Sequence, residues 1–393
     1  MKVLVKASLL KWTRENIRIP LNAVASRLGV KDEDINNWET ADSEISISHL
    51  RALSKIYKRP LGFFFLNTIP ESEKLPADFR INYSTNNEEQ LSTEIILAIR
   101  RAHEIQENKM ELPYVEFDNE KIIFKAKLES DPNVLAIKLR NRLRLTLEEQ
   151  TKWGNPAVAY KAWKDLIEFY LGIIILEFSL PINEVRALSL NDNESPIIII
   201  NSKDVPSAKS FSLFHELYHI ALGKEGICDL NINTYKLPFQ KKQIEIACNQ
   251  FSAEFLVPKR AFLGYSIRLG ILQNKKFTDD ELIELAKHFN VSRQVILRRF
   301  FDLNYVSETD YFKRIHQWKM EYTNKKAKKG FANPIDTSMK HNSRPYILQV
   351  LNAYHENKIS LRSVGQLLNT SIKYVSKIEN KTKNSYDGRT SFI

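Results

Sequence analysis

The chain has 393 residues, 43% of them hydrophobic, and a formal net charge of +11, which suits two to four domains with sizeable cores. Only two cysteines occur, Cys228 and Cys248, which excludes a disulfide framework and indicates a reducing compartment. No stretch approaches the ~20 apolar residues of a membrane span, and the N-terminal segment lacks a signal-peptide cleavage site. We therefore expect a soluble, cytoplasmic protein.

Residues 1–70 are predicted to form a bundle of short helices. The expected elements are helices over residues 9–16, 21–30 and 32–39, a fourth helix from Ser48, and a closing segment at 60–66. Ala25, the turn at Gly29 and the inward-facing Ile35 and Trp38 resemble the lambda-repressor-like (Xre/Cro) helix-turn-helix family.

That fold usually reads DNA through the start of its third helix. Here Lys31 is followed by three carboxylates at 32–34, which DNA phosphates would repel. Asn36 and Asn37 can still reach adenines. Lys31, Asn36 and Asn37 are therefore the candidate contacts to DNA or to a protein partner. Docking on a related repressor domain is the more natural use of an acidic face.

Residues 71–155 are predicted to be a helical linker region. One long helix is expected from Ser92 to about Met110 and a second helical piece over residues 132–150. Leucine recurs every four residues from Leu135 to Leu147. We expect this stripe to pack in a core rather than to form a dimer seam.

A histidine pair follows a helix predicted at 159–170 and three strands predicted at 172–178, 185–190 and 196–200. His215 and His219 are four residues apart on a predicted helix, so their side chains lie about 40° apart around its axis. Both imidazoles can reach one metal ion, and Glu216 can hold the water that the metal activates. This is the HExxH arrangement of zinc peptidases. The alternative is a surface helix with two structural histidines.

A third ligand is expected on the helix predicted at 244–258. Glu245 is the assigned ligand, and Asn249, four residues later, is assigned the role of orienting a ligand. Glu254 is the rival ligand, although it points nearly the opposite way from Glu245. Cys248 could also bind the metal, but a buried structural thiol is the simpler interpretation.

The sequence FSLFHELYH at 211–219, followed by ExxxNQFSAEFLVP from Glu245, resembles the ImmA/IrrE family of zinc metallo-endopeptidases. The resemblance implies that His215, His219 and Glu245 hold Zn²⁺ and that Glu216 is the general base. It also implies that the substrate is a specific protein, typically a helix-turn-helix repressor.

The chain departs from that family at two positions. Tyr218 stands where a small residue is frequent, which makes it a candidate cleft-lining residue, and Cys248 stands where alanine is usual. Strand 185–190 is expected to be an edge strand that pairs with extended substrate. The stabiliser of the oxyanion is not singled out; the candidates are Tyr218, Tyr235, His103 and His288.

The C-terminal residues 301–393 contain 16 Lys and Arg against 8 Asp and Glu, with the densest cluster at 325–329. Such a region can meet nucleic acid or an acidic partner, or simply be a solvated surface.

These elements predict a mainly α multidomain protein: a helix-turn-helix bundle (1–70), a helical linker region (71–155), an α+β zincin-like peptidase domain with a small sheet (156–300) and a basic helical C-terminal region (301–393). The expected function is that of a zinc endopeptidase that cleaves a repressor and so controls a mobile element, a toxin–antitoxin or defence locus, or a stress response. One alternative is a non-catalytic DNA-binding regulator or antitoxin-like component, and another is a module that only senses a ligand. DNA and a second copy of the chain are open as partners; a membrane is not expected.

Overall fold

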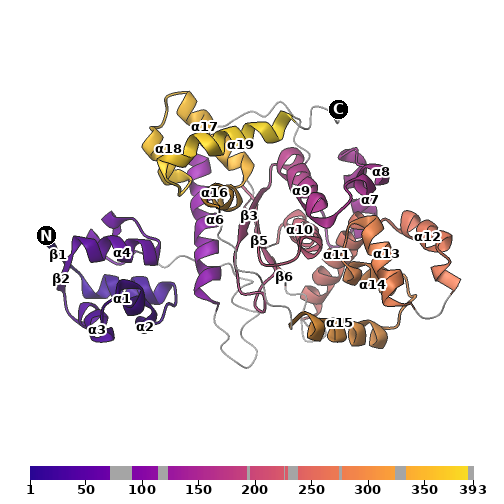
Figure 1. The fold of residues 1–393 in the computed structure, drawn as a ribbon, viewed down its shortest axis with the longest axis horizontal. Helices are drawn as coiled ribbons and strands as arrows, with labels where there is room; N and C mark the ends of the chain where they lie inside the picture. Colours follow the sequence, from indigo (N-terminus) through magenta and orange to yellow (C-terminus); the bar gives the residue numbers. More distant parts are fainter. Residues whose placement is uncertain are drawn as a thin grey trace. The chain divides into compact units, whose positions relative to one another are not determined.

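The protein is mainly helical with small sheets, as the sequence predicts (Figure 1). The computed structural model describes residues 1–70, 91–113, 123–192, 195–224, 226–228, 238–273, 277–323 and 333–387. Contacts divide the chain into two compact units, Met1–His103 and Glu104–Ile393. Within the described residues, no helix combines the length and the apolar character that crossing a membrane requires.

The first unit is built from short helices and a two-stranded ribbon. Its elements are β1 (Lys2–Val5), α1 (Ala7–Asn16), α2 (Leu21–Leu28), α3 (Asp32–Thr40), β2 (Ser43–Ser46), α4 (Ile47–Tyr57), the 3₁₀ helix η1 (Leu61–Phe65) and the first part of α6 (Thr93–Glu111). Gly29 ends α2 in the left-handed conformation at φ 71°, which suits a residue without Cβ. The antiparallel pairing of β1 with β2 was not predicted.

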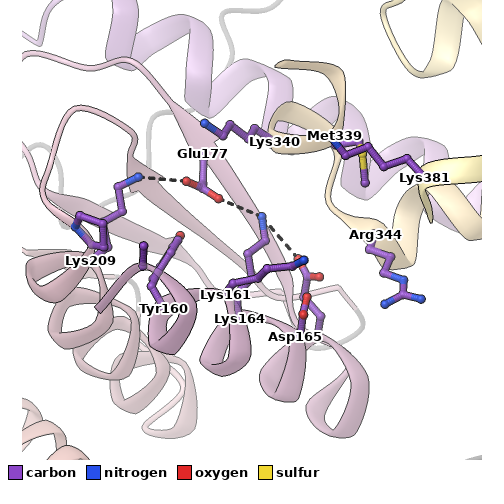
Figure 2. A pocket seen from close by; sticks show the side chains of 13 residues that line it. Tyr160, Lys161, Lys164, Asp165, Glu177, Lys209, Met339, Lys340, Arg344 and Lys381 are labelled. Carbon is purple, nitrogen blue, oxygen red and sulfur yellow. Dashed lines mark hydrogen bonds and ion pairs between the residues drawn. The ribbon is translucent and has the colours of Figure 1, made fainter. Parts of the chain in front are cut away.

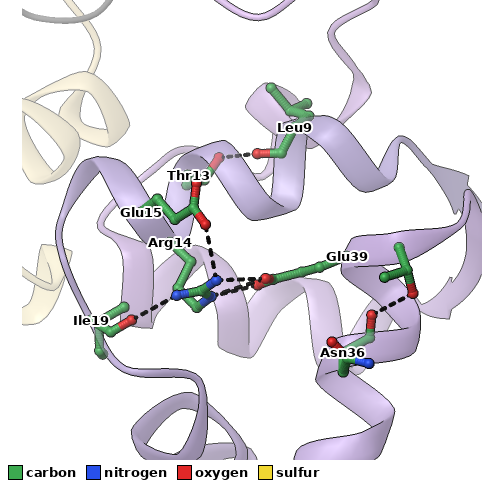
Figure 3. Close-up of polar contacts among 8 residues, drawn as sticks. Leu9, Thr13, Arg14, Glu15, Ile19, Asn36 and Glu39 are labelled. Carbon is green, nitrogen blue, oxygen red and sulfur yellow. Dashed lines mark hydrogen bonds and ion pairs between the residues drawn. The ribbon is translucent and has the colours of Figure 1, made fainter.

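A bidentate ion pair joins α1 to α3 in this unit (Figure 3). The Arg14 guanidinium donates from Nε to Glu39 Oε1 at 2.8 Å and from Nη2 to Glu39 Oε2 at 2.8 Å. Nη1 of the same group donates to the carbonyl oxygen of Ile19. Glu39 is buried, so this pair fixes the angle between the two helices.

The leucine-rich segment at 132–150 is not one helical piece, contrary to the prediction. It forms α7 (Pro132–Arg142) and α8 (Leu147–Lys152). Arg144 breaks the helix at φ 50°, and Thr146 restarts it by accepting a hydrogen bond from the Glu149 backbone N–H. The stripe from Leu135 to Leu147 is therefore divided between two helices.

The second unit contains a four-stranded sheet in the order β3-β5-β4-β6. The strands are β3 (Ile174–Phe178), β4 (Ala187–Leu190), β5 (Ile197–Asn201) and β6 (Gly226–Cys228). β3 and β5 are parallel, whereas β4 runs antiparallel to both of its neighbours, β5 and β6. The predicted edge strand at 185–190 is therefore an inner strand, because β6 covers the side of β4 that was expected to be open.

Helices pack on this sheet and continue into a helical layer (Figure 1). They are α9 (Pro156–Leu166) with a π-helical turn (Ile167–Leu171), α10 (Pro206–Ala221), α11 (Phe239–Leu256), α12 (Lys259–Arg268), the 3₁₀ helix η4 (Ile271–Gln273), α13 (Asp279–Phe289), α14 (Arg293–Asp302) and α15 (Glu308–Thr323). α10 packs against the strands on one side and against α11 on the other. Trp163, Phe214 and Phe255 form the centre of this core, with ring centroids 4.1–5.5 Å apart. α10 and α11 are consequently held rigidly together.

The C-terminal helices pack against β3, the edge strand farthest from β6 in the sheet. They are α16 (Pro334–Asn342), α17 (Arg344–His355), α18 (Leu361–Leu367), the 3₁₀ helix η5 (Ile372–Tyr374) and α19 (Val375–Asp387). Ser343 fixes this contact, because its hydroxyl donates to Glu168 at 2.6 Å and accepts from the Ile175 N–H at 3.2 Å. The basic cluster at 325–329 lies outside the described residues.

Candidate metal centre

The two histidines of the motif face one another on α10. His215 and His219 are one helical turn apart, and their Nε2 atoms lie 3.2 Å from each other. Both rings are almost wholly buried, because α10 packs between the sheet and α11. Within the described residues neither Nδ1 atom has a hydrogen-bond partner, so the Nε2 atoms are the ones that converge.

Glu245 on α11 completes a triangle with these two nitrogens. Its Oε2 lies 3.1 Å from Nε2 of His215, and its Oε1 lies 3.3 Å from Nε2 of His219. Ligand atoms bound ~2.1 Å from a tetrahedral zinc ion are about 3.4 Å apart. The 3.2 Å between the two nitrogens is near this spacing, whereas Glu245 approaches each nitrogen with a different oxygen atom.

Cys248 lies next to this triangle, one turn after Glu245 on α11. Its sulfur and a ligand nitrogen of each histidine lie within 4.8 Å of one another, so among the described residues His215, His219 and Cys248 form the group that could hold a metal ion. This group contains Cys248 in place of Glu245, the third ligand that the sequence predicts. Burial raises the pKa of the thiol to about 11, although His219 opposes the shift. Glu254, the rival carboxylate, is not at the centre: it forms a buried ion pair with Arg299 on α14.

Glu216 is held by the sheet. The Ser189 hydroxyl on β4 donates to Glu216 Oε2 at 2.6 Å, whereas Oε1 has no hydrogen-bond partner among the described residues. Glu216 is 0% exposed, and burial raises its pKa against the opposing effect of the two histidines and Ser189. The free Oε1 atom is the one available to accept a proton from water.

Gly226 on β6 lies directly over this carboxylate. A Cβ atom added to Gly226 would be 2.6 Å from Cγ and Cδ2 of the His219 ring and 2.9 Å from Glu216 Oε2. Ser189 and Gly226 carry no signal in the sequence, because only the pairing of β4 with β6 and the packing of α10 on these strands bring them to the histidines.

Residues 170–301, which contain the histidine pair, Glu216 and Glu245, match the Peptidase_M78 family model, described as the IrrE N-terminal-like domain. This segment, about a third of the chain, is similar to an IrrE N-terminal-like domain and is called the M78 domain below. The M78 domain thus comprises the sheet, α10, α11 and the helices as far as α14, and the converging nitrogens and carboxylates lie at its centre.

Other comparisons add little beyond the M78 domain. No curated protein matches the chain. One similar solved structure is a Mycobacterium tuberculosis transcriptional regulator, which is 13% identical with a TM-score of 0.31. The likeness covers 43% of this chain and 46% of that chain, so the chain spans less than half of that structure.

The remaining predicted site residues of the M78 domain lie away from the converging atoms. Tyr218 does not line a cleft: it is fully buried in the core and stacks on Phe251, with centroids 4.7 Å apart. Asn249 is half-buried, and within the described residues it makes no hydrogen bond to either histidine or to Glu245. His288 stacks on Tyr265 at 3.6 Å.

Two oxyanion candidates cannot be related to the M78 domain. Tyr235 lies outside the described residues, and His103 belongs to the first compact unit. The candidate contacts to DNA or a partner, Lys31, Asn36 and Asn37, are exposed on α3 and at its start in that unit.

A separate cavity of about 320 Å³ lies between α9, the start of α10 and the C-terminal helices. Figure 2 shows Glu177 between Lys209 and Lys164, which approach its carboxylate to 3.1 and 3.2 Å. Burial alone would raise the pKa of Glu177, but the two lysines lower it to about 2. None of the side chains around the histidine pair lines this cavity, so the ion pairs hold α9, β3 and α10 together at a distance from the metal centre.

Proposed function

We propose that this chain is a zinc-dependent endopeptidase that cleaves a specific protein, such as a helix-turn-helix repressor. Such cleavage would control transcription of a mobile element, a toxin–antitoxin or defence locus, or a stress response. The observation that carries the proposal is the convergence of the His215 and His219 Nε2 atoms and the two Glu245 carboxylate oxygens at 3.1–3.3 Å, with Glu216 beside them.

Glu245 is the proposed third ligand, in preference to Cys248. Its two oxygens lie 3.1 and 3.3 Å from one histidine nitrogen each, although the Cys248 sulfur also lies within 4.8 Å of these nitrogens and forms a hydrogen bond with His219. A set of two histidines and one glutamate is also that of hydrolytic zinc sites, which keep their fourth position open. Cys248 is then a buried neighbour of the site, and Asn249 acts on the ligands only if it reorients.

Zinc held by this set would acidify a water molecule and polarise the scissile carbonyl. Glu216 Oε1 accepts the proton of the attacking water and then donates it to the leaving amine. Ser189 keeps Oε2 engaged, so that Oε1 is the oxygen that exchanges the proton. The complete burial of the carboxylate favours this transfer, because it raises the affinity of Glu216 for a proton.

The test uses the zinc-loaded full chain, a helix-turn-helix repressor as the candidate substrate, and two variants. Glu216→Gln should keep its zinc and lose cleavage of the repressor by a factor of at least about 10², because only the proton acceptor is removed. Glu148→Gln, on the exposed surface of α8, is the matched control and should cleave like the wild type. Cleavage is followed by mass spectrometry of the products. Equal cleavage by the wild type and Glu216→Gln would refute the proposal.

The first unit gives the proposed enzyme a recognition module. The short α2 and α3 joined at Gly29 are proposed to be a lambda-repressor-like helix-turn-helix, whose exposed Lys31, Asn36 and Asn37 meet DNA or a related repressor domain. The three carboxylates in the first turn of α3 favour a protein partner over DNA phosphates.

A second candidate function is that of a non-catalytic regulator. One observation favours it: Glu216 is wholly buried, so a substrate cannot reach the carboxylate in this conformation. Unchanged biological activity of Glu216→Gln would support the regulator.

A further inference from the structure

The strand that covers Glu216 is β6, a segment of the protein itself rather than a bound peptide. β6 pairs antiparallel with β4 in the register Ala187↔Cys228, Leu188↔Ile227 and Ser189↔Gly226. Ser189, opposite Gly226, is the residue that donates to Glu216. The backbone of β6 therefore passes over the Glu216 carboxylate, beside Ser189 on β4, which donates a hydrogen bond to that carboxylate.

The edge of β4 that β6 occupies is the place where an extended substrate is expected to bind. Peptides bind commonly by adding a strand to an exposed sheet edge through main-chain hydrogen bonds. β6 occupies this edge of β4, and Gly226 on β6 lies against His219 and Glu216. The contact is so close that residue 226 has no room for a side chain, because an added Cβ would meet His219 and Glu216 at 2.6–2.9 Å.

The burial of the site shows what this occupation does. Glu216, His215 and His219 are 0%, 2% and 3% exposed, whereas the Glu245 side chain is 15% exposed. A general base has to lie within hydrogen-bond reach of its water while the scissile peptide lies beside it. With β6 in place, the carboxylate is closed off on the side of β4.

We propose that β6 is an internal stand-in for the substrate: it holds the pairing edge of β4 in the resting protein, and an extended peptide must replace it before cleavage. The proposal rests on the peptidase function proposed above. β6 suits this role because it is only three residues long and pairs with one strand, so that few hydrogen bonds are lost when it leaves.

A reversible covalent lock tests the proposal. Ala187 lies opposite the native Cys228, and directly opposed residues of an antiparallel pair have Cα atoms about 4.5–5.5 Å apart, within the Cα range that a disulfide spans. Ala187→Cys can therefore be oxidised to tie β6 to β4 and reduced to release it. Ala187→Ser, which cannot form the bond, is the matched control.

Binding of a tetrapeptide hydroxamate to the zinc-loaded full chain is the first readout. It requires the metal ion and a free edge of β4 for the peptide, but it does not require catalysis. The oxidised variant, with its disulfide verified by mass spectrometry, should bind the hydroxamate at least about 10-fold more weakly than the same protein after reduction. Cleavage of the unfolded protein β-casein should be lost and regained in parallel. Equal binding and cleavage before and after reduction would overturn the proposal.

The opposite change provides a second test that does not depend on the disulfide. Gly226→Ala places a methyl group against His219 and Glu216 and should push β6 off β4, raising β-casein cleavage several-fold above that of the wild type. Gly264→Ala on α12 is the control, because an added Cβ there meets nothing within 4 Å. Unchanged or lower cleavage by Gly226→Ala, with zinc content and melting temperature like those of the control, would show that β6 is part of the catalytic framework.

A failure of the proposed role of β6 can be distinguished from a failure of the proposed peptidase function. If the wild type holds no zinc, or if Glu216→Gln cleaves as fast as the wild type, the peptidase function is wrong and the role of β6 fails with it. If zinc binds and cleavage depends on Glu216, but the lock has no effect, only the role of β6 is wrong.

Discussion

The Ser189 hydroxyl on β4 lies 2.6 Å from Oε2 of Glu216 on α10 and donates a hydrogen bond to it. Ser189→Ala removes this bond and frees the carboxylate to rotate away from the water that it should deprotonate. A hydrogen bond to a charged group contributes about 1.5–3 kcal/mol, so we expect kcat to fall by roughly 10- to 100-fold. Zinc content should not change, because Ser189 is not among the three proposed ligands.

The control for this experiment is Ser210→Ala, also a buried serine, whose hydroxyl, among the described residues, donates to the Pro206 carbonyl of its own helix. It should keep wild-type kcat. A Ser189→Ala enzyme with unchanged kcat would show that the strand does not position Glu216.

The buried ion pair between Glu254 and Arg299 links α11 to α14. Burial lowers the pKa of Arg299 to about 10, yet the guanidinium stays charged at neutral pH. Arg299→Met leaves the Glu254 carboxylate buried without its partner, which should reduce the free energy of unfolding by about 3–5 kcal/mol. Urea unfolding followed by tryptophan fluorescence measures this. Adding Glu254→Gln should recover part of the loss; a double variant less stable than Arg299→Met would contradict the assignment.

Glu177 should make the stability of the second unit depend on acid pH. Its pKa is about 2 in the folded chain against the usual 4.5, because Lys164 and Lys209 outweigh the effect of burial. A lowered folded-state pKa stabilises the fold fully above about pH 4.5, and this contribution is lost as the pH falls toward 2. Glu177→Gln should therefore be less stable than the wild type by about 3 kcal/mol at neutral pH.

The difference between Glu177→Gln and the wild type should shrink as the pH is lowered from 4.5 to 2, as measured by urea unfolding at each pH. Glu148→Gln removes an exposed carboxylate and should track the wild type throughout. A difference that is constant with pH would mean that Glu177 is not charged in the folded chain.

Arg14 should not be replaceable by lysine. Its guanidinium makes two parallel bonds to Glu39 and a third to Ile19, a geometry that a single ammonium group cannot reproduce. Arg14→Lys should lower the melting temperature of the first unit, with a loss of about 1–3 kcal/mol in unfolding free energy. Lys11→Arg, an exposed change on the same helix, is the control. Equal melting of both variants would show that the ion pair contributes nothing.

The histidine helix and the helix of Glu245 could be predicted because their signals are local. The spacing of His215 and His219 and the apolar period of the residues around them predict both the helix and the face that carries the two histidines. The buried strand at Ile197–Asn201 could also be predicted, because it is a continuous apolar run.

Features that depend on register or on backbone exceptions could not be read from the sequence. β6 is a three-residue strand without any periodic pattern, and only its pairing with β4 places Gly226 over Glu216. Arg144 adopts a positive φ that a non-glycine residue rarely shows, so nothing in the sequence predicted the break between α7 and α8. The burial of Tyr218 depends on tertiary packing. Both sides of α10 are covered, so the Tyr218 ring lies in the core.

X-ray absorption at the zinc edge of the zinc-loaded full chain tests the metal centre most directly. The proposed set of His215, His219 and Glu245 predicts one zinc per chain with only nitrogen and oxygen neighbours at ~2.0–2.2 Å. A sulfur neighbour at ~2.3 Å would identify Cys248 as a ligand and contradict the proposed centre, as would a chain that binds no zinc.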